Sequence, residues 1–164
     1  MYTYNNAYEE IETLNRIIGN LSKVPRSELR KKLHNALLLV QEELEETQEA
    51  LAQEDYTEVL DGAVDLLVVT VGLLQILKAN GFDTEGAVQE TNSNNLSKFC
   101  TTEQQVRETY DHYEKRGIVC SLSFDDKSGL FAVKNKQTGK LLKKVGFIPN
   151  DLKAYVPEDI LYLS

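Results

Sequence analysis

At 164 residues, 41% of them hydrophobic and 27% charged, the chain is long enough for one domain with a real core and a small appendage. Its formal net charge of −8 argues against a nucleic-acid duplex or an anionic membrane as partner. The two cysteines, Cys100 and Cys120, have neither CxxC spacing nor a disulfide framework, which predicts a reducing cytoplasm.

The first half of the chain carries the pattern of three helices. Apolar residues at helical spacing and a stop at Gly19 define the first helix. The second follows a break at Pro25, with Ser27 as its expected cap, and the third opens with the capping pair Asp55 and Glu58. The predicted helices cover residues 6–18, 27–52 and 55–80.

The second half carries shorter elements. The loop "NSNNLSKF" precedes a helix with a capping box at Thr102 and Gln105 and a stop at Gly117. Beyond Gly117 the segments are rich in β-branched or aromatic residues and are separated by the turn sequences "DDKSG" and "KQTG", which indicates antiparallel strands. The predicted helices cover 84–91 and 102–116, and the loop covers 92–99. Two or three strands are predicted, from the segments 118–124, 130–135 and 140–147.

These elements predict a mainly α protein. Residues 1–117 are expected to form an antiparallel helical bundle, and residues 118–164 a small C-terminal appendage of antiparallel β-strands. No charged segment followed by an apolar one opens the chain, so no signal peptide is expected. The most apolar run, 66–77, has about twelve residues where a membrane span needs roughly 20. We therefore expect a buried helix there, and no membrane partner.

The acidity of the chain is confined to one window. Between Leu33 and Leu77 there is no lysine or arginine, whereas outside it 18 basic residues face 16 acidic ones. The usual Glu–Lys pairs of an exposed helix are therefore absent from this window. Its ten acids are Glu42, Glu43, Glu45, Glu46, Glu49, Glu54, Asp55, Glu58, Asp61 and Asp65.

Helical geometry, at 100° per residue, separates the glutamates of the second helix. The expected core face consists of Leu33, Leu37, Val40, Leu44 and Leu51. A neighbouring stripe consists of Ala36, Leu39, Glu43, Glu46 and Ala50. Glu43 and Glu46 thus lie between small or apolar residues, while Glu42, Glu45 and Glu49 point to solvent.

The third helix supplies a second acidic pair. Asp61 and Asp65 are four residues apart on a helix that is apolar almost all round, a pattern typical of a buried helix. A buried ionised carboxylate is costly unless it is paired or bound to a metal. Exposed like charges at this spacing cost only roughly 0.2–0.5 kcal/mol. The environment of Asp61 and Asp65 therefore decides between a structural and a functional role.

Two arrangements of these carboxylates remain open. In one, basic side chains from elsewhere neutralise them, and the candidates are Arg26, Lys98 and Arg107. In the other, two carboxylates from each of two antiparallel helices hold one or two Mg²⁺ ions, which prefer carboxylate and water oxygens. The candidate metal ligands are Glu43, Glu46, Asp61 and Asp65.

The segment "QEELEETQEAL", followed after "AQEDY" by "TEVLDGAVDLLVVTVGLL", resembles the all-α nucleoside triphosphate pyrophosphohydrolases. That superfamily includes the MazG proteins, the dimeric dUTPases and phosphoribosyl-ATP pyrophosphohydrolase, and its pattern is EExxE followed by ExxD. The chain is most similar to the MazG-like, phosphoribosyl-ATP pyrophosphohydrolase-like branch, many of whose members are phage or bacterial. "NSNNLSKF" resembles the Asn/Ser-Asn-x-Ser-Lys loop of that branch, and the resemblance covers roughly residues 5–100.

The second motif departs from the family pattern. Asp65 stands at the aspartate of ExxD, but the glutamate position falls on Gly62, so Asp61 has to replace it. An alternative register uses Glu58 and Asp61, which do read ExxD. We prefer Asp61 and Asp65, because Glu58 already has a structural role as a capping residue.

The resemblance implies Mg²⁺-dependent hydrolysis of a nucleoside triphosphate to the monophosphate and pyrophosphate, with Mn²⁺ as the alternative ion. The motif EExxE falls on Glu42, Glu43 and Glu46, and Glu42 or Glu43 is the candidate base that accepts a proton from water. The candidate substrate-binding residues are Asn92, Asn95 and Lys98. A homodimer or homotetramer in the cytoplasm of a bacterium or a phage-infected cell is implied as well.

The rival interpretation is a non-catalytic helical module. Its acidic face would bind a basic partner protein, or hold a nucleotide without hydrolysing it. The lysines of the β appendage are a solvated face in the simplest case, or a surface for a partner subunit's acidic helices or a nucleotide's phosphates. They are Lys134, Lys136, Lys140, Lys143 and Lys144.

Overall fold

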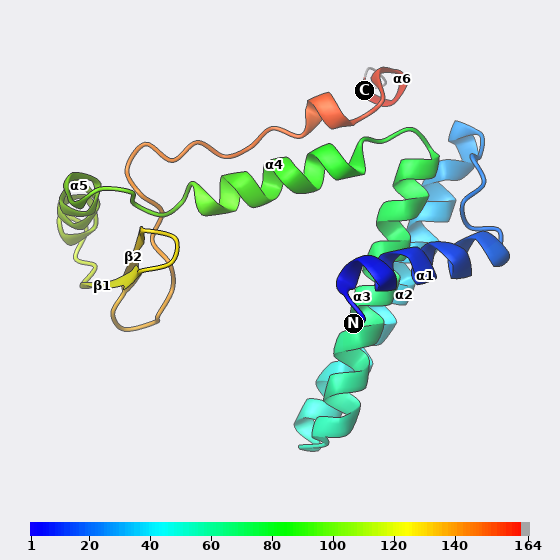
Figure 1. The fold of residues 1–164 in the computed structure, drawn as a ribbon, viewed down its shortest axis with the longest axis horizontal. Helices are drawn as coiled ribbons and strands as arrows, with labels where there is room; N and C mark the ends of the chain where they lie inside the picture. The colour runs from blue at the N-terminus through cyan, green and yellow to red at the C-terminus, as the bar shows by residue number, and fades with distance from the viewer. Residues whose placement is uncertain (162–164) are drawn as a thin grey trace. The chain divides into compact units, whose positions relative to one another are not determined.

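The computed structural model describes residues 1–161, which form two compact units. One unit comprises Met1–Thr84 and the segment that begins at Ala154, and the other comprises Glu85–Lys153. The helices are α1 (Tyr4–Ile17), α2 (Arg26–Ala52), α3 (Tyr56–Ala79), α4 (Thr84–Leu96), α5 (Glu103–Glu114) and α6 (Glu158–Leu161), with a 3₁₀ turn at Lys153–Tyr155 (Figure 1). The strands are β1 (Cys120–Asp125) and β2 (Leu130–Asn135). The predicted mainly α fold with a small antiparallel β-hairpin is confirmed.

The first unit is built on an antiparallel hairpin of α2 and α3, which lie side by side (Figure 1). The connection is short because Glu54 adopts a left-handed conformation, with φ of 57°, and turns the chain back at once. Asp55 then caps α3, since its carboxylate accepts hydrogen bonds from the backbone N–H groups of Thr57 and Glu58 at 3.1 and 3.2 Å. The predicted cap at Asp55 is therefore confirmed. The one at Ser27 is wrong, because α2 begins at Arg26 with Pro25 at the cap position.

The face of α2 that packs against α3 only partly matches the core face predicted from the sequence, because Leu33 and Val40 belong to it and the other predicted leucines do not. Apart from Lys32, the buried and half-buried residues of α2 alternate at steps of four and three, and they are Leu29, Leu33, Ala36, Val40, Glu43, Thr47 and Ala50. Leu37, Leu44 and Leu51 are instead 53%, 44% and 56% exposed. Small residues allow two helices to approach closely, so α2 turns its alanines and Thr47 inward and leaves these leucines outside.

Gly62 sets the distance between α2 and α3. A Cβ atom at this position would lie 3.1 Å from Thr47 Cβ and closer still to Thr47 Oγ1. The Thr47 hydroxyl cannot simply move away, because it donates a hydrogen bond of 2.6 Å to the carbonyl of Glu43. The two helices therefore touch through a glycine and a threonine, one turn from Glu43.

Helix α1 packs on α3 through a buried amide network. Asn15 Nδ2 donates to the carbonyl of Ile11 at 3.0 Å and to Gln75 Oε1 at 3.2 Å, and Gln75 Nε2 donates to the carbonyl of Tyr8 at 3.2 Å. A Cβ at Gly72 would lie 3.2 Å from Asn15 Nδ2, so α3 offers this network a flat backbone surface. Because each amide is satisfied, the network fixes how α1 is rotated on α3.

The run 66–77 of helix α3, predicted to be buried, is buried or half-buried except at Leu67 and Thr70, whereas the N-terminal part of α3 is largely exposed. Gly72, Gln75 and Ile76 are buried, whereas Leu60 and Val64 are 68% and 50% exposed. Among the described residues, one helix, α3, has the length and the apolar composition needed to cross a membrane. Within the chain, 22% of its most apolar stretch is buried. This criterion is weak evidence, because core helices of soluble proteins also meet it. Two neighbouring helices are too few to cover an all-round apolar helix.

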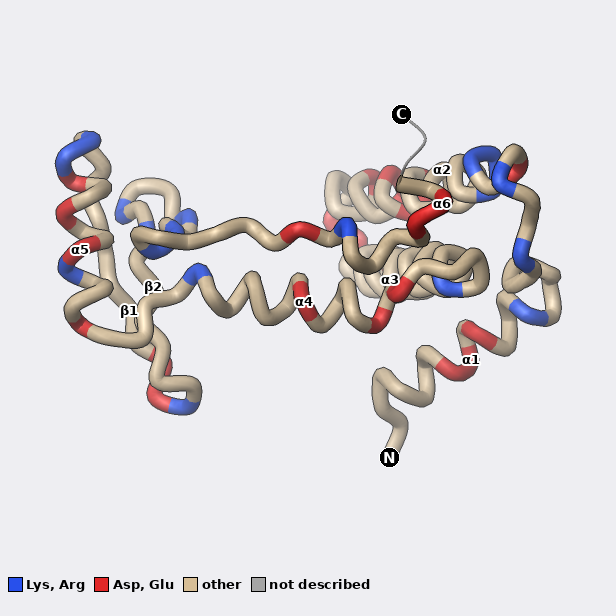
Figure 2. The backbone as a smooth tube through the Cα atoms, turned by 90° about the horizontal axis from the view of Figure 1, so that it is seen from above, with Lys and Arg blue, Asp and Glu red and all other residues tan. Residues whose placement is uncertain are grey.

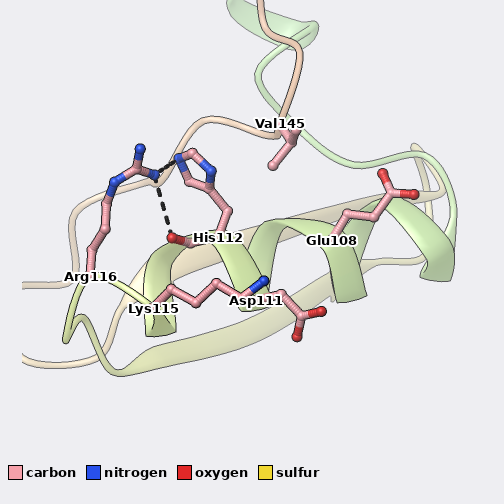
Figure 3. Close-up of a pocket in the computed structure, with 6 residues that line it drawn as sticks. All are labelled: Glu108, Asp111, His112, Lys115, Arg116 and Val145. Carbon is pink, nitrogen blue, oxygen red and sulfur yellow. Dashed lines mark hydrogen bonds between the residues drawn. The ribbon is translucent and has the colours of Figure 1, made fainter.

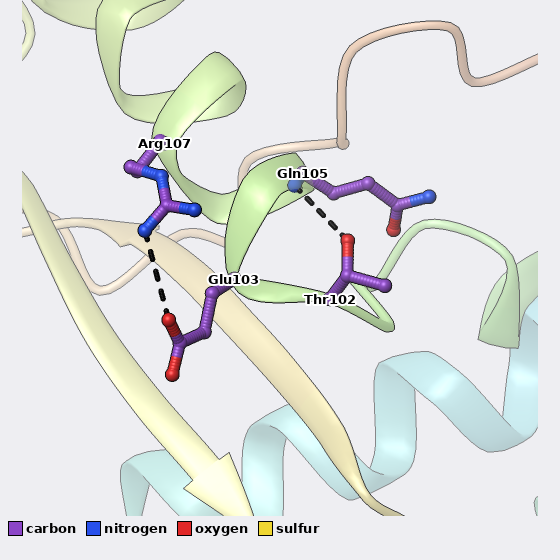
Figure 4. A network of polar contacts seen from close by, with 4 residues as sticks. All are labelled: Thr102, Glu103, Gln105 and Arg107. Carbon is purple, nitrogen blue, oxygen red and sulfur yellow. Dashed lines mark hydrogen bonds and ion pairs between the residues drawn. The ribbon is translucent and has the colours of Figure 1, made fainter.

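The second unit packs α5 on the β-hairpin around a small core. That core consists of Cys100, Val106, Val133 and Leu142. Thr102 caps α5 as predicted, by accepting a hydrogen bond of 3.2 Å from the N–H of Gln105, and Arg107 pairs with Glu103 at 3.6 Å (Figure 4). The predicted domain boundary at residue 117 falls inside this unit, because the hairpin's contacts include α5.

The loop prediction for the second unit is wrong, and of the two or three strands predicted, two form. The expected loop at 92–99 is helical as far as Leu96. The expected strand at 140–147 forms one isolated bridge, between Lys134 and Leu141. Beyond that bridge, the N–H of Lys144 bonds to the carbonyl of Lys98 and the N–H of Val145 bonds to Thr109 Oγ1, so these donors do not extend the sheet.

Replacing Gly62 by alanine tests the close contact between α2 and α3. The new methyl group collides with Thr47, so we expect Gly62→Ala to lower the free energy of unfolding by about 1–3 kcal/mol, the usual cost of overpacking. At an unconstrained helix position the same change would stabilise. Urea unfolding measures the difference, with Ala63→Ser at the exposed neighbouring position as the control. A more stable Gly62→Ala variant would contradict the contact.

Candidate functional site

Glu43 lies in the contact between α2 and α3, next to Asp65. Gly62 faces Thr47 across this contact. In an antiparallel pair, one turn back from Thr47 reaches Glu43, and one turn forward from Gly62 reaches Asp65, so the two carboxylates lie at the same level. Both side chains are half-buried, while the other two candidate ligands, Glu46 and Asp61, are exposed.

The carboxylates of this cluster repel one another. Partial removal from water raises the pKa of Glu43 above its ordinary value of 4.5, and the negative charges of four neighbouring carboxylates raise it further. In order of effect these neighbours are Asp65, Glu46, Glu42 and Asp61. The charges of the other EExxE glutamates and of both aspartates therefore all act on one half-buried carboxylate, Glu43.

Among the described residues of its own unit, no ion pair joins this cluster to a lysine or an arginine. Arg26 donates to the carbonyl of Ile160 at 2.9 Å, Lys98 donates to Asn95 Oδ1 at 2.5 Å, and Arg107 pairs with Glu103. Figure 2 shows acidic residues along α2 and α3, and basic residues where α2 begins. Of these three residues, Arg26 belongs to the same unit as the carboxylates, and its guanidinium is engaged by Ile160.

The donor set suits an open magnesium site better than a closed metal cage. Among residues 1–161, no three histidine, cysteine or acidic side chains converge closely enough to enclose an ion. Mg²⁺ does not require such a cage, because it keeps several waters and binds one or two carboxylates together with substrate phosphates. Glu43 and Asp65 supply such a pair of hard oxygen ligands, with Glu46 and Asp61 on the exposed side.

The residues of the two possible registers of the second motif differ in their environment. Glu58 lies in the exposed first turn of α3, where its N–H bonds to Asp55, and its charge is not among those that raise the pKa of Glu43. Asp65 has the largest such effect of any charged neighbour. Asp61 and Asp65 thus both act on Glu43 whereas Glu58 does not, and the choice of Asp61 and Asp65 as ligands stays a prediction. Gly62, at the family's glutamate position, serves helix packing instead.

A cavity of about 230 Å³ opens between α1, α2 and α3, one helical turn from the carboxylates. Leu39, which lines it, precedes Glu43 by four residues, and Val68 follows Asp65 by three. Most of its wall is apolar, and the polar side chains that reach it include Asn15, Lys32 and Asn35. The sequence analysis missed this cavity. A lone asparagine beside three leucines, in "HNALLLV", is the signal that could have indicated it.

The predicted substrate-binding residues Asn92, Asn95 and Lys98 belong to the second unit. Asn92 and Asn95 are exposed and one turn apart on α4, and the Lys98 ammonium is hydrogen-bonded to Asn95. Lys98 also lies close to Lys143, which was not predicted to belong to the site. The Nζ atoms of Lys98 and Lys143 lie 5.9 and 4.8 Å from the centre of the Phe147 ring. These contacts give Lys98 a fixed environment within its own unit.

A second surface depression lies along α5 (Figure 3). It is lined by Glu108, Asp111, His112, Lys115, Arg116 and Val145, and Arg116 is hydrogen-bonded to the ring and the carbonyl of His112. Two acidic and two basic side chains balance in charge, and the depression is widely open. It lacks the concentrated charge or enclosed apolar wall of a ligand site.

Removal of the Glu43 charge should change how stability depends on pH. A raised carboxyl pKa means that the folded state holds the proton more tightly than the unfolded chain, so ionised Glu43 destabilises the fold at neutral pH. We expect Glu43→Gln to be more stable than the native chain at neutral pH. The difference in the free energy of unfolding between Glu43→Gln and the native chain should shrink as the pH falls toward 4.5, the ordinary pKa of a glutamate.

Urea unfolding at several pH values measures this difference. Glu49→Gln is the matched control, because Glu49 is an exposed glutamate of α2 that does not affect the pKa of Glu43. An equal gain for Glu43→Gln at every pH would show that the substitution acts through packing and that the charge cluster does not strain the fold.

Comparison with known proteins agrees with this geometry. The family model for phosphoribosyl-ATP pyrophosphohydrolase matches residues 11–93, a span that includes all of α2 and α3 and therefore every candidate metal ligand. Neither the curated proteins nor the solved structures yielded a match. The family is one of pyrophosphohydrolases, whose members generally depend on divalent cations. With just over half of its length matched, the chain belongs to the phosphoribosyl-ATP pyrophosphohydrolase family, within the all-α NTP pyrophosphohydrolase superfamily.

Proposed function

We propose that the protein is a Mg²⁺-dependent nucleoside triphosphate pyrophosphohydrolase. It converts a ribo- or deoxyribonucleoside triphosphate, or a related nucleotide, to the monophosphate and pyrophosphate. The observation that carries this proposal is the half-buried pair of Glu43 and Asp65, which repel each other without a basic partner inside the span matched by the family model. A divalent cation bound between the two carboxylates would attract both of them and so offset the repulsion that destabilises the fold.

The chemistry needs one water and one acceptor for its proton. The bound ion would neutralise the phosphate oxygens and orient the water. Glu43, Glu46, Asp61 and Asp65 hold the ion in this proposal, and Glu42 or Glu43 accepts the water's proton. The water oxygen forms a bond to phosphorus at the α–β anhydride, and the bond between that phosphorus and the bridging oxygen breaks. Mn²⁺, with similar preference for oxygen ligands, is the alternative ion.

The second unit is proposed to contribute to substrate binding. The ammonium of Lys98 is oriented by Asn95 and has no ion pair with a carboxylate among the described residues. A lysine in this state is suited to bind a phosphate oxygen as a point charge. Asn92 and Asn95 present exposed amides that can hydrogen-bond sugar, base or phosphate.

The direct test is product analysis on a panel of ribo- and deoxyribonucleoside triphosphates. We expect pyrophosphate rather than orthophosphate, and loss of turnover in EDTA and in both Glu46→Gln and Asp65→Asn. Glu49→Gln should retain turnover, because Glu49 points away from the cluster. Removing the proton acceptor should cost about 10²–10⁴-fold in rate, so Glu42→Gln and Glu43→Gln identify the base.

The same panel separates the enzyme from the rival binding module. A folded protein that binds nucleotides without Mg²⁺-dependent turnover, with an affinity that salt weakens, would support the module instead. Mg²⁺-dependent turnover that survives both ligand substitutions would place the metal elsewhere.

We further propose that the protein works as a homodimer or homotetramer. Leu37, Leu44 and Leu51 are exposed at seven-residue intervals on α2, and Leu60 and Val64 are exposed on α3. Exposed apolar rows of this kind are covered by partner helices in oligomers. A membrane would be an unsuitable cover, because each aspartate of α3 would cost roughly 2.5–3.5 kcal/mol near its centre.

Analytical ultracentrifugation tests the assembly. We expect the native chain to sediment as two or four copies, and Leu44→Glu with Leu51→Glu to sediment as a smaller species. Leu122→Glu is the control, because Leu122 is an equally exposed leucine of β1 in the second unit. A native chain that sediments as a monomer at micromolar concentration would contradict the proposal.

A further inference from the structure

The cavity between α1, α2 and α3 lies on one side of the carboxylates along both helices. The lining residues of α2 run from Lys32 to Leu39, before Glu43, and those of α3 run from Val68 to Ile76, after Asp65. Because the helices are antiparallel, both stretches lie at the same end of the hairpin. A ligand that extends from the carboxylates into the cavity therefore has a charged end and a buried end.

The cavity suits an uncharged, flat group. Leu39, Val68 and Leu73 supply apolar walls, and neither an aspartate nor a glutamate lines it. Its one basic group, Lys32, already donates to the carbonyl of Ser22 at 3.0 Å. At about 230 Å³ it is smaller than the roughly 300–1,000 Å³ of pockets that enclose a drug-sized ligand, so it takes part of a nucleotide rather than all of it.

One face of the cavity is rigid. The two N–H bonds of Asn15 Nδ2 are used by Ile11 and Gln75, and Asn15 Oδ1 accepts a hydrogen bond of 3.0 Å from Asn20. This amide cannot turn over without losing three hydrogen bonds. Gly72 lines the same face and adds no side chain that would fill it. The shape of the cavity is therefore fixed before a ligand enters.

Asn35 is the polar side chain at this cavity whose amide is uncommitted. It is exposed, and no hydrogen bond to it is formed among residues 1–161. Asn20 and Lys32, by contrast, are hydrogen-bonded to Asn15 and Ser22. A carboxamide presents a donor and an acceptor side by side, the pattern that pairs with the hydrogen-bonding edge of a nucleobase.

From this arrangement we propose that the cavity holds the nucleobase of the substrate and that Asn35 is a specificity-determining residue that reads its edge. The base packs between Leu39 and Val68, while the phosphate chain extends toward Glu43 and Asp65. The inference rests on the proposed function in that it takes the ligand to be a nucleotide. It adds the residues that select the base.

Kinetics with and without a base separate this inference from the proposed function. The probes are nucleoside triphosphates and inorganic tripolyphosphate, which has no base. We expect Asn35→Ala to raise KM for the preferred nucleotide about tenfold, the loss of one good hydrogen bond, and to leave turnover of tripolyphosphate unchanged. Asn35→Asp, which loses the donor, should change the order of preference among bases, an effect that a merely structural role would not produce.

Gln48→Ala is the matched control, since Gln48 is an exposed amide of α2 that does not line the cavity. Calorimetry with nucleoside monophosphates in the absence of Mg²⁺ gives a second readout. Binding that depends on the base and weakens in Asn35→Ala supports the cavity even if no triphosphate is hydrolysed, which would refute only the proposed function.

Three results would overturn the inference. One is an unchanged KM for the nucleotide in Asn35→Ala with hydrolysis intact. Another is a loss of tripolyphosphate turnover in Asn35→Ala as large as the loss with the nucleotide. The third is a change of sedimentation in Asn35→Ala, which would show that a second copy of the chain fills the cavity.

Discussion

The hairpin of α2 and α3 has to hold like charges beside an apolar contact. Glu43 occupies a position in the helix–helix seam that an apolar residue would normally fill, and Asp65 approaches it from the other helix. Such repulsion persists in a fold only where packing enforces it. Here the packing comes from Ala36, Thr47 and Gly62, whose small size brings the two helices together. The electrostatic strain and the close packing are therefore two aspects of one arrangement.

The local features of the sequence predicted most of the secondary structure. Caps at Asp55 and Thr102 and the glycine stop at Gly19 depend on nearest neighbours, and they were placed correctly for that reason. The third candidate strand, 140–147, does not continue past Leu142, because the N–H groups of Lys144 and Val145 bond instead to Lys98 and Thr109, which are distant in the sequence. Apolar periodicity alone does not describe such long-range competition.

The carboxylates of the candidate site could be predicted from the sequence, but their surroundings could not. Spacing placed Glu43 among small and apolar residues, and the resemblance supplied Asp65 and its partners. Periodicity could not decide which of two apolar stripes of α2 packs against its own chain and which stays exposed, so Leu37 was assigned to the core although it is 53% exposed. Asn35 was missed because a single amide has no periodic signature, and only the three-helix cavity gives it a context.

Helix α1 contacts α3, and the carboxylates lie on α2 and α3 alone. The reactive groups and one wall of the proposed base cavity therefore belong to separate pieces of the chain, joined through the amides of Asn15 and Gln75. Substitutions along the cavity side of α1, such as at Leu14 or Ile18, can reshape that wall while the acidic cluster stays intact. In evolutionary terms, the proposed base preference would be free to diversify while the carboxylates stay the same.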